Sequence, residues 1–332
     1  METPVVHTVL ALACVSLRRY AEAIQKNLET AAQGEDIEPI HQVRVACRRL
    51  RTALRLFADC LQEDSVFKWR KECKRLLKDL RKARDLDIQI QFLEDLLKKT
   101  IRDKKILPGI KRLLLRLRQK RQRLQKRIRK SADRFRKQNI LKEIALETEQ
   151  LERMQTSAAE AGGLSVAERA GTAVREAIEK TTALLDRLND KKDIKGHHQL
   201  RIAVKRLRYT LETFQPAFKE DFDKLIQPLK KMQTLLGDLN DCAVWLEQIE
   251  KFSAKEKERT EEYFGHARPF LRLQPGIEYV RRNRKKQWQT LFREVFAYCR
   301  KLETDGFWKQ MTKTFAAPEA AFPQENHGPS SP

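Results

Sequence analysis

A histidine followed by a series of arginines occurs twice in this chain, with the spacing of one face of a helix. Residues 36–57 and 193–214 align without a gap at a constant offset of 157 residues, and 11 of the 22 aligned positions are identical. Clustered guanidinium groups suit a polyanion, because each can donate two parallel hydrogen bonds to phosphate oxygens. The duplicated stripe consists of His41, Arg44, Arg48, Arg51 and Arg55 in the first copy and His198, Arg201, Lys205 and Arg208 in the second.

The stripe predicts an amphipathic helix in each copy. One residue turns a helix by about 100°, which keeps the basic residues on one side and places Leu50, Leu54 and Phe57 opposite them. Like charges three or four residues apart destabilise a helix by roughly 0.2–0.5 kcal/mol per pair. A stripe that only kept the chain soluble would alternate in sign, so the duplication favours a bound anion over a solvated charged face. Arg49 and Arg206 lie on the flank, as supporting or surface charges.

Three further sets of cations are candidates for the same anion site. One set, on the expected helix over 66–82, forms a second wall of the anion site or, alternatively, a solvated face paired with Glu72 and Asp79. Residues 102–137 carry 17 basic and two acidic residues, too many to bury, so some of them extend the anion site. A third set lies near residue 283. The candidates are Lys71, Lys74, Arg75, Lys78, Arg81 and Lys82; Arg116, Arg123 and Arg127; and Arg281 and Lys285, with Arg284 as a neighbour.

Composition limits the classes of partner. Lys and Arg number 69 against 46 Asp and Glu, a formal net charge of +23, which favours an acidic partner. The six cysteines show no CxxC pair and no metal-ligand spacing, which indicates reduced, mostly buried thiols in a cytoplasmic protein. The chain has no apolar run near the roughly 20 residues of a membrane span, so we expect no membrane partner.

Helical periodicity dominates the chain and predicts an all-α fold of two pseudo-symmetric helical bundles that enclose a basic cavity or channel. Asp85 and Asp241 are interpreted as helix N-caps, with support of a site arginine as the alternative. The expected organisation is a first bundle over 1–155, a linker over 156–165, a second bundle over 166–312 and a disordered tail over 313–332. The expected helices cover about 6–32, 36–57, 66–82, 85–99, 110–150, 166–188, 196–214, 222–236, 241–252 and 278–304.

The two repeats resemble the CHAD family, the conserved histidine α-helical domain. The resemblance rests on His41-x-x-Arg44-Val45-Ala46-x-Arg48-Arg49-Leu50-Arg51 and on the matching segment from His198 to Tyr209, and it extends over nearly all of 5–312. Ala83-Arg84-Asp85-Leu86-Asp87 and Leu236-Gly237-Asp238-Leu239-Asn240-Asp241 are similar to two further elements of the family. The resemblance implies paired helical bundles around a basic cavity that binds inorganic polyphosphate. The β-barrel triphosphate-hydrolysing domain that often accompanies the family is absent from this sequence.

We therefore expect non-catalytic polyphosphate binding, with association with polyphosphate granules or a role in polyphosphate metabolism, and no metal or cofactor. Nucleic acid is the alternative partner, although the few aromatic residues are not interleaved with the stripe and no nucleic-acid-binding motif occurs. An enzyme using His41 or His198 is the third alternative, but the sequence lacks a glycine-rich phosphate loop and paired carboxylates beside either histidine. The sequence sets no oligomeric state.

Overall fold

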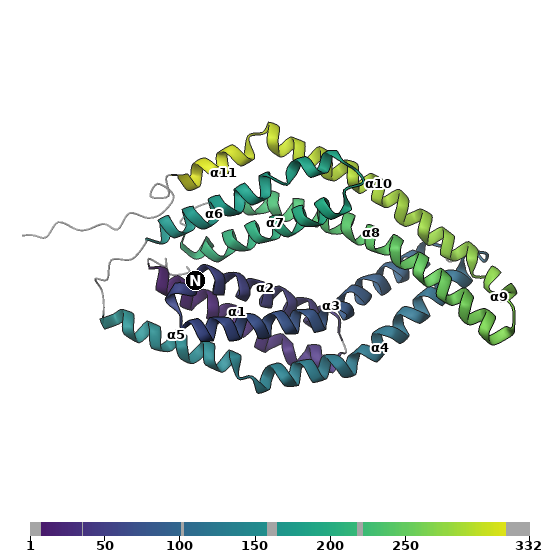
Figure 1. Ribbon diagram of the computed structural model, residues 1–332, viewed down its shortest axis with the longest axis horizontal. Helices are drawn as coiled ribbons and strands as arrows, with labels where there is room; N and C mark the ends of the chain where they lie inside the picture. Colours follow the sequence, from purple (N-terminus) through teal and green to yellow (C-terminus); the bar gives the residue numbers. More distant parts are fainter. Residues whose placement is uncertain (1–7, 35, 101–102, 158–164, 218–221, 317–332) are drawn as a thin grey trace, which may run out of the picture.

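All regular secondary structure in the described part of this computed structural model is helical (Figure 1), which confirms the all-α prediction. The structure describes residues 8–34, 36–100, 103–157, 165–217 and 222–316. The expected linker and tail lie mostly outside these ranges, but residues 313–316 belong to the last helix. The helices are α1 (Val9–Gln33), α2 (Glu38–Leu56), α3 (Glu63–Thr100), α4 (Leu107–Lys137), α5 (Ile140–Ser157), α6 (Val166–Thr182), α7 (Ile194–Phe214), α8 (Phe222–Phe264), α9 (Arg268–Leu271), α10 (Gln274–Thr304) and α11 (Phe307–Ala316), with short 3₁₀ turns at Ala58–Cys60, Leu185–Asn189 and Gln215–Ala217.

The interpretation of Asp85 and Asp241 as helix N-caps was wrong. Both residues lie in the middle of long helices, Asp85 in α3 and Asp241 in α8. The helices continue because no proline interrupts either position and because the buried apolar face persists through it. In α3, for example, Leu80, Ala83 and Leu86 are all buried.

Two other expected helices end earlier than the periodicity indicated. The expected helix over 110–150 is divided at Asn139, whose φ of 56° is left-handed, a conformation that asparagine adopts more readily than most residues. The expected helix over 166–188 ends at Thr182 and continues as a 3₁₀ turn. The apolar seam that crosses each break remains buried, which is why periodicity alone did not reveal the ends.

The largest core lies around α2 and α7, the helices that carry the duplicated stripe. Their apolar faces are buried through Leu50, Leu54, Leu207 and Leu211. Phe57 and Phe214, at equivalent ends of the two repeats, pack edge to face with ring centroids 6.0 Å apart. Each buried leucine or phenylalanine stabilises the fold by about 1.5–3 kcal/mol, so this face determines the orientation of both helices.

A second core joins α3, α4, α8 and α10 at the end of the molecule that carries α9 (Figure 1). The N-terminal turns of α4 and α10 cross there at Gly109 and Gly276. A Cβ atom on Gly109 would lie 2.1 Å from the carbonyl oxygen of Leu273, and one on Gly276 would lie 2.1 Å from that of Ile106. Only glycine permits this close approach.

Candidate anion-binding site

The basic stripes of α2 and α7 approach each other closely enough to interact electrostatically. Burial, followed by the positive charges of Arg201 and Arg48, lowers the pKa of Lys205 to about 7. Burial also lowers the pKa of Arg201, and the charge of Arg48 on α2 adds to this effect while Asp241 opposes it. Residues from the two repeats therefore share one electrostatic environment, although they lie more than 150 residues apart in the chain.

Arg44 is fixed beside this contact by a hydrogen bond to the backbone of α3. Its Nη1 donates to the carbonyl oxygen of Leu77 at 2.6 Å, and the residue is only 7% exposed. Burial, followed by the charge of Arg48, lowers the pKa of Arg44 to about 10, and the carboxylate of Asp85 opposes this change. The site thus holds a buried cation that is incompletely neutralised by the protein.

Two aspartates balance part of this charge. Burial raises the pKa of Asp85, while Arg44 and Arg81 oppose the rise, and Arg81 Nε lies 3.7 Å from an Asp85 carboxylate oxygen. Asp241 acts on the same groups from α8. The role that sequence analysis gave as the alternative, support of a site arginine, is the one consistent with these neighbours. We call the set Arg44, Arg48, Asp85, Arg201, Lys205 and Asp241 the central cluster.

The stripe continues beyond the central cluster in both directions. At one end, burial lowers the pKa of His41, and the positive charge of Arg84 on α3 contributes. At the other end, burial lowers the pKa of Arg51 and Arg55, with further contributions from Arg70 and Arg206. Arg55 also donates to Thr210 Oγ1 at 3.4 Å.

The two histidines are held differently. His41 on α2 is half-buried among cations, which favours its neutral form near neutral pH. The Nδ1 atom of His198 on α7 lies 2.9 Å from the side-chain oxygen of Asn240, so that nitrogen must carry the hydrogen of the bond. Neither histidine forms a hydrogen bond with a carboxylate within the described ranges, so neither has a base-orienting partner there.

Arg208, the last residue of the second stripe, is engaged by the protein itself. Its Nη1 lies 3.1 Å from the carboxylate of Glu212, which is 7% exposed, and its guanidinium lies 4.9 Å from the ring centroid of Tyr209. Arg49 of α2 donates to the same carboxylate at 2.9 Å. Glu212 therefore connects α2 to α7, and the flanking Arg49 takes a structural part.

The candidates on α3 divide into two strips. Lys74 shares a strip with Arg70 and Arg81, because residues four and seven apart lie on one face of a helix. Arg81 was among the predicted residues of this wall, but Arg70 and Arg84 were not, and their spacing with Lys74 was the available signal. The predicted residues Lys71, Arg75 and Lys78 lie one position out of register, on a neighbouring strip, and residues of both strips are exposed.

Contacts on the neighbouring strip fit the solvated-face alternative. Arg75 lies 3.9 Å from Glu72, and Lys71 lies 5.9 Å from the ring centroid of Phe67. These are surface contacts of small energetic value.

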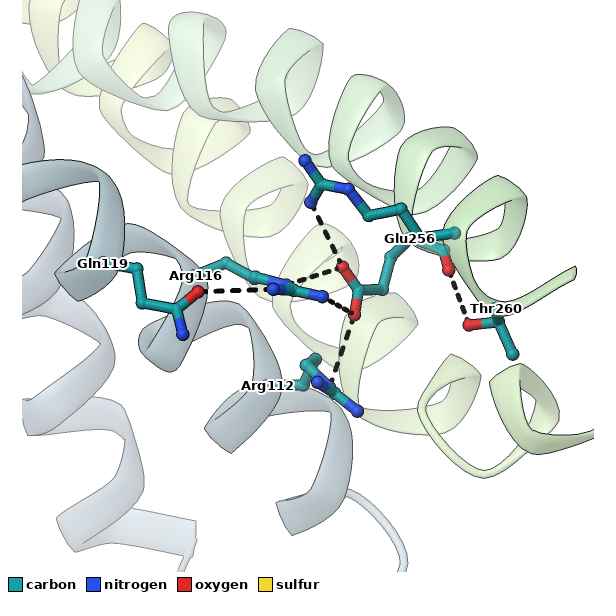
Figure 2. Close-up of polar contacts among 6 residues, drawn as sticks. Arg112, Arg116, Gln119, Glu256 and Thr260 are labelled. Atoms are coloured by element: carbon teal, nitrogen blue, oxygen red, sulfur yellow. Dashed lines mark hydrogen bonds and ion pairs between the residues drawn. The ribbon is translucent and has the colours of Figure 1, made fainter. Parts of the chain in front are cut away.

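The candidates on the long helices also lie apart from the central cluster. Arg116 of α4 pairs with Glu256 of α8 (Figure 2), and Arg123 lines the same cleft. Glu256 follows Asp241 by 15 positions on one helix, a separation of about 22 Å along the axis. Arg127 is exposed on α4.

On α10, the inward-facing cation is Arg284 and not the predicted Arg281 or Lys285. Arg281 pairs with Glu278 at 2.7 Å, and Lys285 is exposed. Arg284 is 7% exposed, and its guanidinium lies 3.2 Å from the ring centroid of Phe92. Asp238 and Asp241 act to raise its pKa, which burial lowers, so Arg284 borders the central cluster.

The described segments show neither a cluster of metal ligands nor a paired cysteine. No group of three or more His, Cys, Asp and Glu residues gathers there as a metal site. All six cysteines are free and five of them are buried, as predicted, with Cys60 intermediate. None of the described helices has the length and apolarity needed to cross a membrane.

Comparisons with known proteins agree with the fold and the motifs. No curated protein matches the sequence. The structure is similar to the CHAD domain of the plant Ricinus communis, with a TM-score of 0.62 and 19% identity over 90% of this chain and 93% of that one. It is also similar to PptA from Streptomyces chartreusis, with a TM-score of 0.59 and 15% identity over 89% and 100% of the two chains. The CHAD domain family model matches residues 16–250, and the chain therefore belongs to the CHAD domain family.

Proposed function

We propose that this protein binds inorganic polyphosphate without catalysis, using the central cluster and the stripes that extend from it. The observation that carries the proposal is the packing of α2 against α7, which brings Arg48 of α2 close enough to lower the pKa of Arg201 and of Lys205 on α7. Like charges held together in a partly buried site repel each other, and a linear polyanion that lies between them relieves the repulsion along its whole length. We further propose that binding serves cytoplasmic polyphosphate granules or polyphosphate metabolism.

We propose that the site is a basic cavity between two related halves, residues 1–155 and 166–312, produced by an internal duplication. Three observations support this proposal. The stripes on α2 and α7 align at one offset, and Asp85 on α3 and Asp241 on α8 occupy similar positions relative to them. The contacts of Gly109 and Gly276 are also reciprocal: Gly109 lies against the backbone just before Gly276, and Gly276 lies against the backbone just before Gly109.

The expected site residues contribute unequally in this proposal. Arg44, Arg48, Arg201 and Lys205 form the centre, and His41, His198, Arg51 and Arg55 extend it. Arg208 contributes less because Glu212 already holds it. Lys74 and Arg284 border the site, whereas Lys71, Arg75, Lys78, Arg127, Arg281 and Lys285 contribute long-range attraction from the surface.

The test compares polyphosphate binding by two double variants, each of which replaces two basic residues by alanine. Arg48→Ala with Lys205→Ala removes one central residue from each stripe. Lys130→Ala with Lys286→Ala removes two exposed lysines from α4 and α10 and serves as the control. We expect the central variant to lose at least about tenfold in affinity and the control less than about twofold, by calorimetry with polyphosphate of defined length. Equal losses in the two variants would refute the site, because they would show that only net charge matters.

Competition with nucleic acid separates the proposal from its main alternative. We expect polyphosphate to displace DNA at equal phosphate concentration and physiological salt, because its oxyanions are closer together than those of a nucleic acid backbone. DNA that outcompetes polyphosphate would establish the alternative. Absence of phosphate release during binding checks the non-catalytic part of the proposal.

A further inference from the structure

A second group of arginines surrounds Glu256 near the C-terminal end of α8, remote from the central cluster (Figure 2). Glu256 is 2% exposed. Arg116 of α4 donates to both of its carboxylate oxygens, from Nε at 3.0 Å and from Nη2 at 3.2 Å. Arg112 Nε lies 3.4 Å from the same carboxylate, so one buried acid positions two guanidinium groups from α4.

The arginines of this group exceed what Glu256 can neutralise. Arg259 Nη1 also lies 3.7 Å from the carboxylate, which gives one acid three cationic neighbours. Arg116 uses its remaining terminal nitrogen in a 3.3 Å bond to Gln119, yet a guanidinium has five N–H groups, so donors remain for a ligand. Pre-positioned donors of this kind bind anions well because little side-chain freedom is lost on binding.

These arginines line an open cleft of ≈ 650 Å³ between α4 and α8. Two exposed aromatic residues, Tyr263 and Phe264, line the same cleft. Tyr263 is 82% exposed and Phe264 is 54% exposed, and their rings pack edge to face with centroids 4.7 Å apart. Exposed aromatic rings beside clustered arginines provide a π-face on which a planar ligand can stack. Arg123, Thr260 and Glu262 complete the lining.

We propose that this cleft binds a nucleoside di- or triphosphate. The phosphates lie against Arg112, Arg116, Arg123 and Arg259, and the base stacks on Tyr263 or Phe264. Arginine forks match phosphate oxygens, and aromatic side chains stack on any base through its π-face. The cleft volume falls within the range of small-molecule sites. Polyphosphate alone would leave the aromatic rings unused, and for that reason the geometry favours a ligand that has both a phosphate chain and a planar ring.

The test measures ATP and inorganic tripolyphosphate binding by calorimetry on the full-length chain. We expect Tyr263→Ala with Phe264→Ala to weaken ATP binding by about 5- to 100-fold, the range expected for loss of base stacking, and to leave tripolyphosphate binding unchanged. Both residues are exposed, so the fold should persist, and circular dichroism checks this. Arg123→Ala should weaken ATP binding as well, because Arg123 lines the cleft and its exposed guanidinium forms no ion pair in the described structure.

Binding of ATP at the central cluster would be recognised by two controls. In an Arg48→Ala background, replacing Tyr263 and Phe264 by alanine should still weaken ATP binding by the same factor. Photo-crosslinking with 8-azido-ATP should label the segment around Tyr263. ATP binding that is insensitive to the aromatic variant and sensitive to Arg48→Ala would overturn the proposal. An equal loss of ATP and tripolyphosphate in the aromatic variant would overturn it too, because the rings would then act without contacting a base.

Discussion

Gly109 of α4 and Gly276 of α10 contact each other through their backbones at the point where the two helices cross. A Cβ on Gly109 would come within 2.8 Å of the Gly276 Cα, and the reciprocal distance is also 2.8 Å. Each glycine follows a proline in the first turn of its helix, in the similar segments Leu107–Ile110 and Gln274–Ile277.

We expect Gly109→Ala to destabilise the protein by about 1–3 kcal/mol, since the new methyl group would meet backbone atoms that cannot rotate away. Gly276→Ala should have a similar effect for the same reason. Thermal unfolding followed by circular dichroism measures both. Gly237→Ala is the control, because Gly237 lies within α8 and a Cβ atom added there would lie 3.9 Å from its nearest neighbour, Arg201 Nε. That variant should be neutral or slightly more stable, and equal destabilisation in all three would contradict the packing argument.

Polyphosphate binding should take up protons above neutral pH. Lys205 has a pKa of about 7 in the free protein, below the usual lysine value of 10.5, and a bound polyanion favours the charged amine. Between those two values, binding must protonate Lys205, so affinity should fall as pH rises from about 7 towards 10. At pH 8 we expect an uptake of up to about one proton, obtained from calorimetry in buffers of different ionisation enthalpy.

Lys205→Arg provides the matched variant for this prediction. Arginine stays charged over the whole range, so the Lys205 contribution to proton uptake should disappear while binding persists. His41, whose pKa is lowered by burial and Arg84, contributes separately at lower pH. An unchanged proton uptake in the arginine variant would show that Lys205 is not the titrating group.

Glu212→Gln should lower stability and raise polyphosphate affinity at the same time. Glu212 is 7% exposed and accepts from Arg49 of α2 and Arg208 of α7. Loss of its charge should cost about 1–3 kcal/mol, a reduced value because the Arg49 side chain is 32% exposed. The same change frees Arg208 and adds one positive charge to the site, which should strengthen binding several-fold.

Urea unfolding and calorimetry measure the two opposite effects. Glu247→Gln is the control: its pair with Lys251 is exposed on α8, so both stability and affinity should remain nearly unchanged. A Glu212 variant that lost both stability and affinity would indicate that Arg208 needs its carboxylate partner in order to bind the ligand.

Helices α2 and α7 were predictable from sequence because the apolar residues that give them helical periodicity are the same residues that pack into the core. In both helices, basic residues occupy one face and apolar residues the opposite face, and the apolar faces are buried as expected. The continuity of α3 and α8 was not predictable in the same way, because an aspartate in mid-helix resembles an N-cap until its tertiary neighbours are known. The neighbours of Asp85 come from α2, α7 and α8.

The cations of the long helices could not be assigned from spacing alone. Arg284, Arg281 and Lys285 lie within one and a half turns of one another, and only packing against Phe92 determines that Arg284 turns inward. Likewise, the position of Arg116 depends on Glu256, which is 140 residues away in the chain. Long-range pairs of this kind leave no periodic signal in either segment.

The burial of Glu256 determines how the molecule responds to ionic strength. Mobile ions screen exposed charges beyond a Debye length of about 8 Å at physiological ionic strength, but they screen interactions inside the protein far less. The Glu256 side chain is 3% exposed, so its attachment of α4 to α8 should survive a salt concentration that strips a polyanion from the exposed parts of the stripe. We therefore expect concentrated salt to release a polyanion from the stripe while the contact between α4 and α8 persists.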